Sequence, residues 1–167
     1  MPHGTTNRIP DGRGFGAPRR CVHLDPEPGP AVSPAGPRPL SGVSVLMVDD
    51  EDAVRRALTM YLRRQGATVV EAKSYAEAAD QLLSRRFDVV VSDVMLGDGS
   101  GLTLERICCN IKPPAAFVAI TGALESDLDE DVSPRTVFLQ KPFALDDLRA
   151  RVLEALGRMA AAPASEH

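Results

Sequence analysis

Short runs of apolar residues, many of them β-branched, alternate along the chain with segments in which apolar residues recur every three or four positions. The short runs cover residues 43–48, 68–70, 87–92, 116–121 and 136–139. Several of these runs are apolar at nearly every position, which is typical of strands that are covered on both faces of a sheet. We therefore predict that these five segments are strands.

Two helices are predicted in the first half of this pattern. The first is indicated by an apolar stripe that ends before Gly66 and is formed by Val54, Ala57, Leu58, Tyr61 and Leu62. A capping-box pattern from Ser74 to Glu77 predicts the start of the second helix. The residues of this second helix that are expected to face inward are Ala78, Leu82 and Leu83.

The second half of the pattern predicts two further helices and one weak segment. A third helix is expected over residues 102–107, before the helix-breaking prolines 113 and 114. The last helix begins near Leu145, and its apolar face is formed by Leu148, Val152 and Leu156. Between these helices, residues 124–132 are rich in acids and Pro134 follows. We therefore expect a shortened fourth helix of one or two turns.

The alternation of strands and helices predicts an α/β fold of the (βα)5 type. Right-handed crossovers place the strands of such a chain in one doubly wound, parallel, five-stranded sheet. Ligands bind to such sheets at the carboxyl ends of the strands, beside the point where the strand order reverses. The polar residues that follow the predicted strands are therefore the candidates for function.

The ends of the chain differ in composition from the patterned region. Residues 1–40 hold nine of the 14 prolines and six of the 13 glycines. Such a segment buries too little apolar surface to offset the entropy that is lost on ordering. We expect residues 1–41 to be a disordered extension, residues 42–158 to form the domain and residues 159–167 to be a flexible tail.

Charge and cysteine content limit the partners and the location that we expect. Residues 41–167 carry 14 Lys and Arg against 20 Asp and Glu, and an acidic domain is a poor partner for DNA or anionic lipid. No apolar run approaches the roughly 20 residues that span a bilayer, and the N-terminus lacks the apolar stretch of a signal peptide. Because the three cysteines form no disulfide framework, we expect a soluble, cytoplasmic protein.

Three carboxylates, a hydroxyl and an ammonium group lie at the ends of the predicted strands, from Asp49, Asp50, Asp93, Thr121 and Lys141. Two unit charges roughly 4 Å apart repel by about 4 kcal/mol at an effective dielectric near 20, so converging carboxylates need a proton or a cation. Mg²⁺ is typically held by a few carboxylates and several waters, and it can align a phosphoryl group for in-line transfer. Taken singly, each of these residues also has a structural explanation in a turn, a cap or an ordinary dipeptide.

Four sequence segments together resemble the signature segments of response-regulator receiver domains. They are Val-Asp-Asp-Glu-Asp (48–52), Ser-Asp-Val-Met-Leu-Gly-Asp-Gly-Ser-Gly-Leu (92–102), Ile-Thr-Gly (120–122) and Phe-Leu-Gln-Lys-Pro-Phe (138–143). Their order and spacing are close to those of the family, and the resemblance extends from residue 43 to about 158. It implies a flavodoxin-like strand topology and a role in the phosphorelay signalling of two-component systems.

The resemblance implies a phosphoacceptor and a metal site. Asp93 would attack the phosphohistidine of a histidine kinase or a phosphotransfer protein and form an acyl phosphate. The implied cofactor is Mg²⁺, held by Asp50, Asp93 and the backbone carbonyl of Met95, while Asp49 acts through water. Lys141 would pair with Asp93 before transfer and with the phosphoryl oxygens afterwards.

The resemblance also implies a conformational switch. Thr121 would donate its hydroxyl to a phosphoryl oxygen, and Phe138 would follow the threonine toward the interior. The Lys141–Pro142 peptide bond would be cis. Gly97 stands where the family usually has proline, which is expected to loosen the loop.

Several functions remain open at this point. The chain is expected to be a stand-alone receiver that is phosphorylated, contacts a downstream protein target and is a monomer or a weak homodimer. A receiver fragment of a hybrid histidine kinase and a pseudo-receiver that binds without phosphotransfer are alternatives. An aspartate-nucleophile phosphatase of the haloacid dehalogenase type usually has a second acid where Met95 stands, so no multiple-turnover enzyme is expected.

Overall fold

A computed structural model describes residues 38–123 and 132–161. Five parallel strands form one sheet in the order β2-β1-β3-β6-β7. The strands are β1 (Ser44–Val48), β2 (Thr68–Ala72), β3 (Val89–Asp93), β6 (Ala116–Thr121) and β7 (Val137–Gln140). The helices are α1 (Asp52–Arg64), α2 (Tyr75–Ser84), α3 (Gly101–Asn110) and α4 (Leu145–Ala161). The predicted doubly wound parallel sheet and its flavodoxin-like strand order are confirmed.

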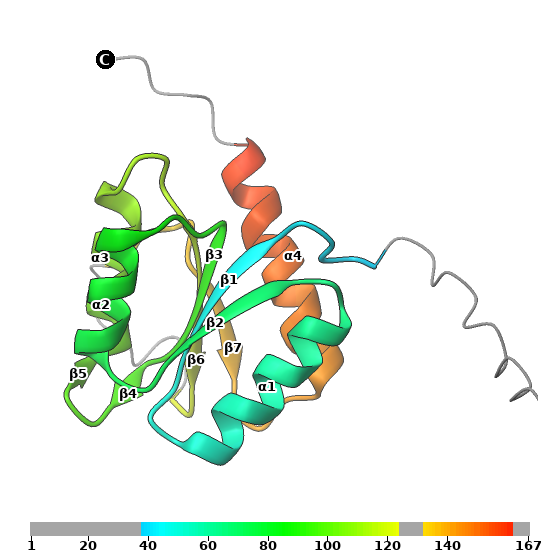
Figure 1. Cartoon of the computed structure of the whole chain (residues 1–167), viewed down its shortest axis with the longest axis horizontal. Helices are drawn as coiled ribbons and strands as arrows, with labels where there is room; N and C mark the ends of the chain where they lie inside the picture. Colours follow the sequence, from blue (N-terminus) through cyan, green and yellow to red (C-terminus); the bar gives the residue numbers. More distant parts are fainter. Residues whose placement is uncertain (1–37, 124–131, 162–167) are drawn as a thin grey trace, which may run out of the picture. The chain divides into compact units, whose positions relative to one another are not determined.

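The sheet is covered on both faces, which explains its nearly continuous apolar strands. Helices α1 and α4 lie against one face and α2 and α3 against the other (Figure 1). Alternate strand residues therefore enter two separate cores, as Val89 and Val90 do in β3. No helix in the described parts of the chain is long and apolar enough to cross a bilayer.

The start of α2 follows the predicted capping pattern. The Ser74 hydroxyl accepts a hydrogen bond from the backbone N–H of Glu77 at 3.2 Å, while the Glu77 carboxylate accepts one from the N–H of Lys73 at 3.0 Å. The prediction that Leu83 faces inward is wrong, because its side chain is 76% exposed. Leu82 and Leu83 are adjacent, and the helical period turns only Leu82 toward the sheet.

Residues on either side of the expected span of residues 42–158 also pack against the core. Leu40 is fully buried in the core beneath α1 and α4, and its N–H donates to the carbonyl oxygen of Gln65 at 3.0 Å. At the other end α4 continues to Ala161, and Met159 packs against the same core. The expected short fourth helix falls on residues 124–131, which lie outside the described residues.

Candidate functional site

Asp93 is the last residue of β3, at the carboxyl edge of the sheet. The strand order reverses here, since β1 lies between β2 and β3, and this is where ligands of doubly wound sheets bind. The Asp93 side chain is 10% exposed and forms an ion pair with Nζ of Lys141 through Oδ2. Its Oδ1 accepts a hydrogen bond from the N–H of Met95 at 2.8 Å. The carboxylate is thus held in place and still reaches solvent.

Lys141 approaches Asp93 from the end of β7. Its backbone N–H donates to the carbonyl oxygen of Thr121 at 2.7 Å, and the Lys141–Pro142 peptide bond is cis. Burial by itself would lower the pKa of Lys141, but the hydrogen bond and the negative charge of Asp93 outweigh burial and raise the pKa. The ammonium group is therefore charged at neutral pH and is available to an anionic ligand.

Asp49 is the most deeply buried acid at this edge, with 1% of the residue exposed. Its Oδ1 accepts the N–H of Glu51 at 2.8 Å, whereas the buried Oδ2 has no hydrogen-bond partner among the described residues. Burial raises the pKa of Asp49, and the negative charges of Asp93 and Asp50 add to that increase. An unpartnered buried carboxylate oxygen is costly, so this position favours binding of a proton or a cation.

Asp50 lies at the exposed rim beside these two acids. A Cβ atom placed on Gly97 would lie 3.5 Å from Oδ2 of Asp50, so the carboxylate leans toward the loop that follows Asp93. Within the described ranges, no group of three or more His, Cys, Asp or Glu side chains is arranged to hold a metal ion. Mg²⁺ nevertheless suits the residues present, because it needs only one or two carboxylates with waters and Oδ2 of Asp49 is unpartnered.

Thr121 ends β6, the strand beside β3, and Phe138 lies on β7, the strand that follows β6 in the sheet. Thr121 is 3% exposed, and its hydroxyl oxygen accepts the N–H of Ala123 at 3.0 Å. Phe138 pairs in register with Ala119 and packs, half-buried, in the core beneath α2 and α3. Strand alternation places Thr121 on the same face as Ala119 and Phe138. The hydroxyl and the aromatic ring are thus neighbours on one face, although the Thr121 hydroxyl forms no hydrogen bond with the side chain of Asp93 or Lys141 in the described residues.

The loop after Asp93 forms a small antiparallel hairpin, β4 (Met95–Leu96) and β5 (Gly99–Ser100), which the sequence pattern did not predict. Its turn residue Asp98 accepts the N–H groups of Tyr75 and Ala76 at 2.8 and 3.0 Å. These bonds lower the pKa of Asp98 and tie the hairpin to the start of α2. The predicted loosening at Gly97 is therefore offset by a contact between residues more than 20 positions apart in sequence.

The structure thus brings Asp93 and Lys141 into direct contact, with buried Asp49 and exposed Asp50 beside them. The carboxylate of Asp93 is fixed in position, and a cation and an unpartnered carboxylate oxygen lie next to it. These are the groups that a site needs to accept a phosphoryl group. The model of the response regulator receiver domain matches residues 45–153. The chain belongs to the response regulator receiver family.

Similar proteins include both kinases and regulators. The chain is 38% identical over 122 residues to the sensor kinase CckA of Brucella abortus, covering 70% of this chain and 13% of that protein. It is 29% identical over 106 residues to the receiver protein CpdR of the same species, covering 62% of this chain and 88% of that protein. The first curated relatives are mostly much longer, and the chain spans 13% of CckA, 27% of the regulator PilR and 55% of the regulator KdpE.

Solved structures agree with this assignment. A response regulator receiver protein from Sinorhizobium medicae superposes with a TM-score of 0.65 at 26% identity, covering 70% of this chain and 96% of that one. The receiver domain of the hybrid histidine kinase CckA superposes with a TM-score of 0.56 at 30% identity, covering 68% of this chain and 98% of that one. The whole described fold is thus that of a receiver domain.

Proposed function

We propose that this domain accepts a phosphoryl group on Asp93 from a phosphohistidine and passes the signal on through changed protein contacts. This proposal rests on the contact between Asp93 and Lys141 at the carboxyl edge of the sheet. In the transfer, a carboxylate oxygen of Asp93 attacks phosphorus, an O–P bond forms and the P–N bond of the donor breaks. The product is an acyl phosphate on Asp93 and a free histidine on the donor.

The surrounding residues would each serve one part of this step. Lys141 would move from the carboxylate to the phosphoryl oxygens, which carry more negative charge. Asp50 and Asp93, with the carbonyl oxygen of Met95 and with Asp49 acting through water, would hold Mg²⁺. Bound Mg²⁺ would neutralise charge on the phosphoryl oxygens and keep donor and acceptor in line.

Thr121 and Phe138 would report the modification to the surface. The Thr121 hydroxyl now accepts from the N–H of Ala123, and a phosphoryl oxygen on Asp93 would offer it an acceptor. Its movement inward would free space for Phe138 on the same face of the sheet. The surface around Phe138 on β7, which would contact the partner protein, would change its shape, while the sheet itself would keep its structure.

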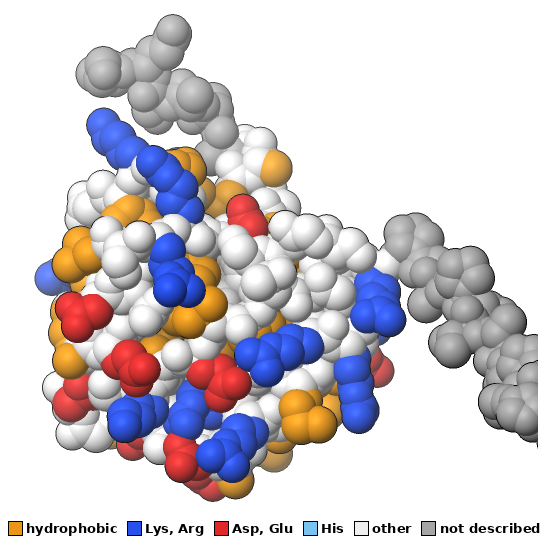
Figure 2. Space-filling view, viewed as in Figure 1, with side chains coloured by type: hydrophobic (Ala, Val, Ile, Leu, Met, Phe, Trp, Pro, Cys, Tyr) orange, Lys and Arg blue, Asp and Glu red, His pale blue; other side chains and the backbone are white. Residues whose placement is uncertain are grey.

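The proposed partners are proteins. This protein would act in the cytoplasm as a monomer or a weak homodimer. Its phosphoryl donor would be a histidine kinase or a phosphotransfer protein, and its target another protein. Acidic and basic side chains are interspersed on the face shown in Figure 2, which gives no support to a nucleic-acid surface. Met95, two residues after Asp93, supplies no general acid, which supports a phosphoacceptor over a turnover phosphatase.

The similarity to CckA favours a second arrangement, in which this domain is the receiver part of a longer hybrid kinase. The chemistry at Asp93 would be the same, but the donor would be attached to the same polypeptide. The intact mass of the native protein, isolated from its source cells, distinguishes the two arrangements. A mass equal to that of the 167-residue chain supports the separate receiver.

Labelling with acetyl phosphate and Mg²⁺ tests the proposal. Wild-type protein is expected to take up about one phosphoryl group, Asp93→Asn none, and Asp98→Asn as much as wild type, because Asp98 caps α2 and does not face the site. Equal labelling of Asp93→Asn would overturn the assignment of Asp93. A folded wild type that takes up no phosphate would instead indicate a pseudo-receiver.

A further inference from the structure

Arg55, in the first two turns of α1, is a buried cation that makes no direct contact with the Asp93 side chain. It is 7% exposed, whereas the next residue, Arg56, is exposed to solvent. A buried guanidinium is costly unless its donors are satisfied. The partners that satisfy it show what it does.

The Arg55 guanidinium joins three segments of the chain. Its Nη1 donates to the backbone carbonyl oxygen of Asp49 at 2.8 Å, and its Nη2 pairs with Oδ1 of Asp52. Its Nε lies 3.5 Å from Oε2 of Glu71 in β2. The end of β1, the start of α1 and the neighbouring edge strand are therefore held by one rigid, planar group.

The contact with Asp49 bears directly on Asp50. The carbonyl oxygen of Asp49 and the amide nitrogen of Asp50 belong to one planar peptide unit, so fixing the oxygen fixes the direction in which the chain enters Asp50. Within residues 38–123 and 132–161, no hydrogen bond or ion pair restrains the exposed Asp50 carboxylate itself. Its placement beside Gly97 therefore depends on the backbone.

We propose that Arg55 is a positioning residue, which holds the Asp49–Asp50 peptide so that the Asp50 carboxylate is set for a divalent cation. This inference rests on the proposed function, since it assigns Arg55 to the same site. Without the guanidinium, the peptide can rotate and Asp50 samples positions that do not bind the ion. The expected consequence is weaker binding of Mg²⁺, with little change in the chemical step once Mg²⁺ is saturating.

The chain offers a matched control on the same helix. Arg63 also donates to a backbone carbonyl, that of Val69 at 2.9 Å, and lies 3.6 Å from Oε1 of Glu71. It thus links α1 to β2 as Arg55 does, but it makes no contact with Asp49. If a substitution of Arg55 weakens Mg²⁺ binding and a substitution of Arg63 does not, the loss arises at the Asp49–Asp50 peptide and not from the attachment of α1 to β2.

The test is a titration with Mg²⁺, followed through the backbone amide resonances of the full chain, for wild type, Arg55→Met, Arg55→Lys and Arg63→Gln. We expect the Kd for Mg²⁺ to rise about tenfold in Arg55→Met, less in Arg55→Lys, which keeps one donor, and less than twofold in Arg63→Gln. In labelling with acetyl phosphate, the Mg²⁺ concentration for half-maximal rate should rise in the same order, while the rate at saturating Mg²⁺ changes less than about threefold.

An unchanged Kd in a folded Arg55→Met protein, or an equal loss in Arg63→Gln, would overturn the inference. If Arg55→Met does not fold, Arg55→Lys decides, and a Kd within error of wild type would count against the positioning role. A wild type that binds Mg²⁺ and is labelled on Asp93 keeps the proposed function in either case. A wild-type protein that neither binds Mg²⁺ nor is labelled on Asp93 would contradict both the proposed function and the role of Arg55.

Discussion

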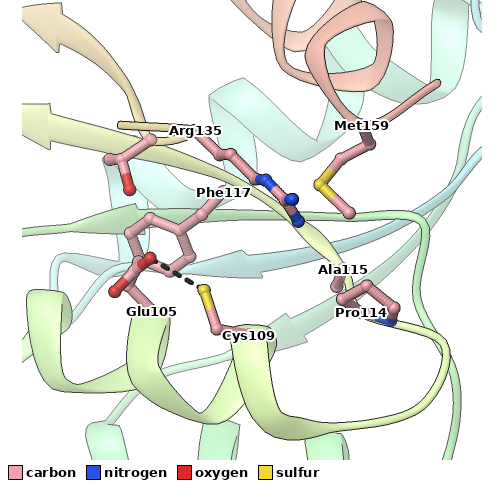
Figure 3. A pocket seen from close by; sticks show the side chains of 8 residues that line it. Glu105, Cys109, Pro114, Ala115, Phe117, Arg135 and Met159 are labelled. Atoms are coloured by element: carbon pink, nitrogen blue, oxygen red, sulfur yellow. Dashed lines mark hydrogen bonds between the residues drawn. The ribbon is translucent and has the colours of Figure 1, made fainter. Parts of the chain in front are cut away.

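The two edges of the parallel sheet each bury a carboxylate, but the two carboxylates have different partners. At the carboxyl edge, Asp93 is 7% exposed and pairs with Lys141. At the amino edge, Glu105 of α3 is 4% exposed and accepts a hydrogen bond from Sγ of Cys109 at 3.0 Å, in a pocket between α3 and the last turns of α4 (Figure 3). Arg135 also lines this pocket, but no ion pair joins it to Glu105 within the described residues.

The difference between the edges shows that burial of an acid does not by itself indicate function. Burial, followed by the hydrogen bond and charge of Glu105, raises the pKa of Cys109 to about 11, so the thiol stays neutral beside the carboxylate. At the other edge a charged ammonium and the unpartnered Oδ2 of Asp49 stand next to Asp93. The ion pair with a lysine ammonium, which Glu105 lacks among the described residues, makes the carboxyl edge the one suited to an anionic ligand.

The largest effect on stability is expected at the amino edge. Leu40→Ala removes a fully buried side chain and should lower the free energy of unfolding by about 2–5 kcal/mol. The matched control is Leu83→Ala, whose side chain is 76% exposed and whose loss should change stability by less than about 0.5 kcal/mol. Urea denaturation measures both, and equal effects would show that Leu40 is not part of the core.

The largest effect on chemistry is expected at the carboxyl edge. Lys141→Gln removes the cation that faces Asp93, and the rate of labelling by acetyl phosphate should fall about a hundredfold, as when one donor to a transition-state oxygen is lost. Lys112→Gln, which changes a lysine far from Asp93 in the fold, should leave that rate unchanged. Similar losses in both variants would mean that general charge, and not the contact with Asp93, controls labelling.

A smaller effect is expected from the contact between the hairpin and α2. Asp98→Ala removes the acceptor for the N–H groups of Tyr75 and Ala76 and should lower the midpoint of urea denaturation slightly, as for the loss of a helix cap. Because the pKa of Asp98 is lowered in the folded state, this stabilisation is present above about pH 4 and is lost as the pH falls further. The difference between wild type and Asp98→Ala should therefore shrink in acid, and a difference that is constant with pH would contradict the role of the charge.

The smallest effect is expected at Cys109. Because its pKa is about 11, alkylation at pH 8 should be slow and should rise with pH up to that value. Glu105→Gln removes the carboxylate and should speed alkylation of Cys109 a few-fold, while the buried Cys108 stays unreactive. Peptide mass spectrometry with fragmentation, which locates the alkyl group on either cysteine, follows these rates. If the alkylation rate of Cys109 is unchanged in Glu105→Gln, the carboxylate of Glu105 does not control the reactivity of this thiol.

The strands and the positions of the acids could be predicted from the sequence, because both follow from local patterns. Apolar runs that are covered on both faces define the strands. Because the strands are parallel, their carboxyl ends bring Asp49, Asp93 and Lys141 to one edge of the sheet, independently of the conformation of the loops. The direct contact between Asp93 and Lys141 is a consequence of that topology.

Other features could not be predicted, because they depend on contacts between distant residues. Leu40 is a single apolar residue in a proline-rich segment, and only its burial beneath α1 shows that it belongs to the core. Arg55 resembles a surface arginine until β1 and β2 close around it. Asp98 caps a helix that begins 23 residues earlier in the chain. None of these contacts leaves a periodic signal in the sequence.

The position of the phosphoryl group on the labelled protein shows whether Asp93 is the phosphoacceptor. After reaction with acetyl phosphate and Mg²⁺, borohydride reduction converts an acyl phosphate into a stable alcohol that peptide mass spectrometry can locate. Reduction is expected at residue 93 alone. Reduction at Asp49, Asp50 or Glu105 in place of Asp93, or a fully folded protein with no reduced residue, would contradict this expectation.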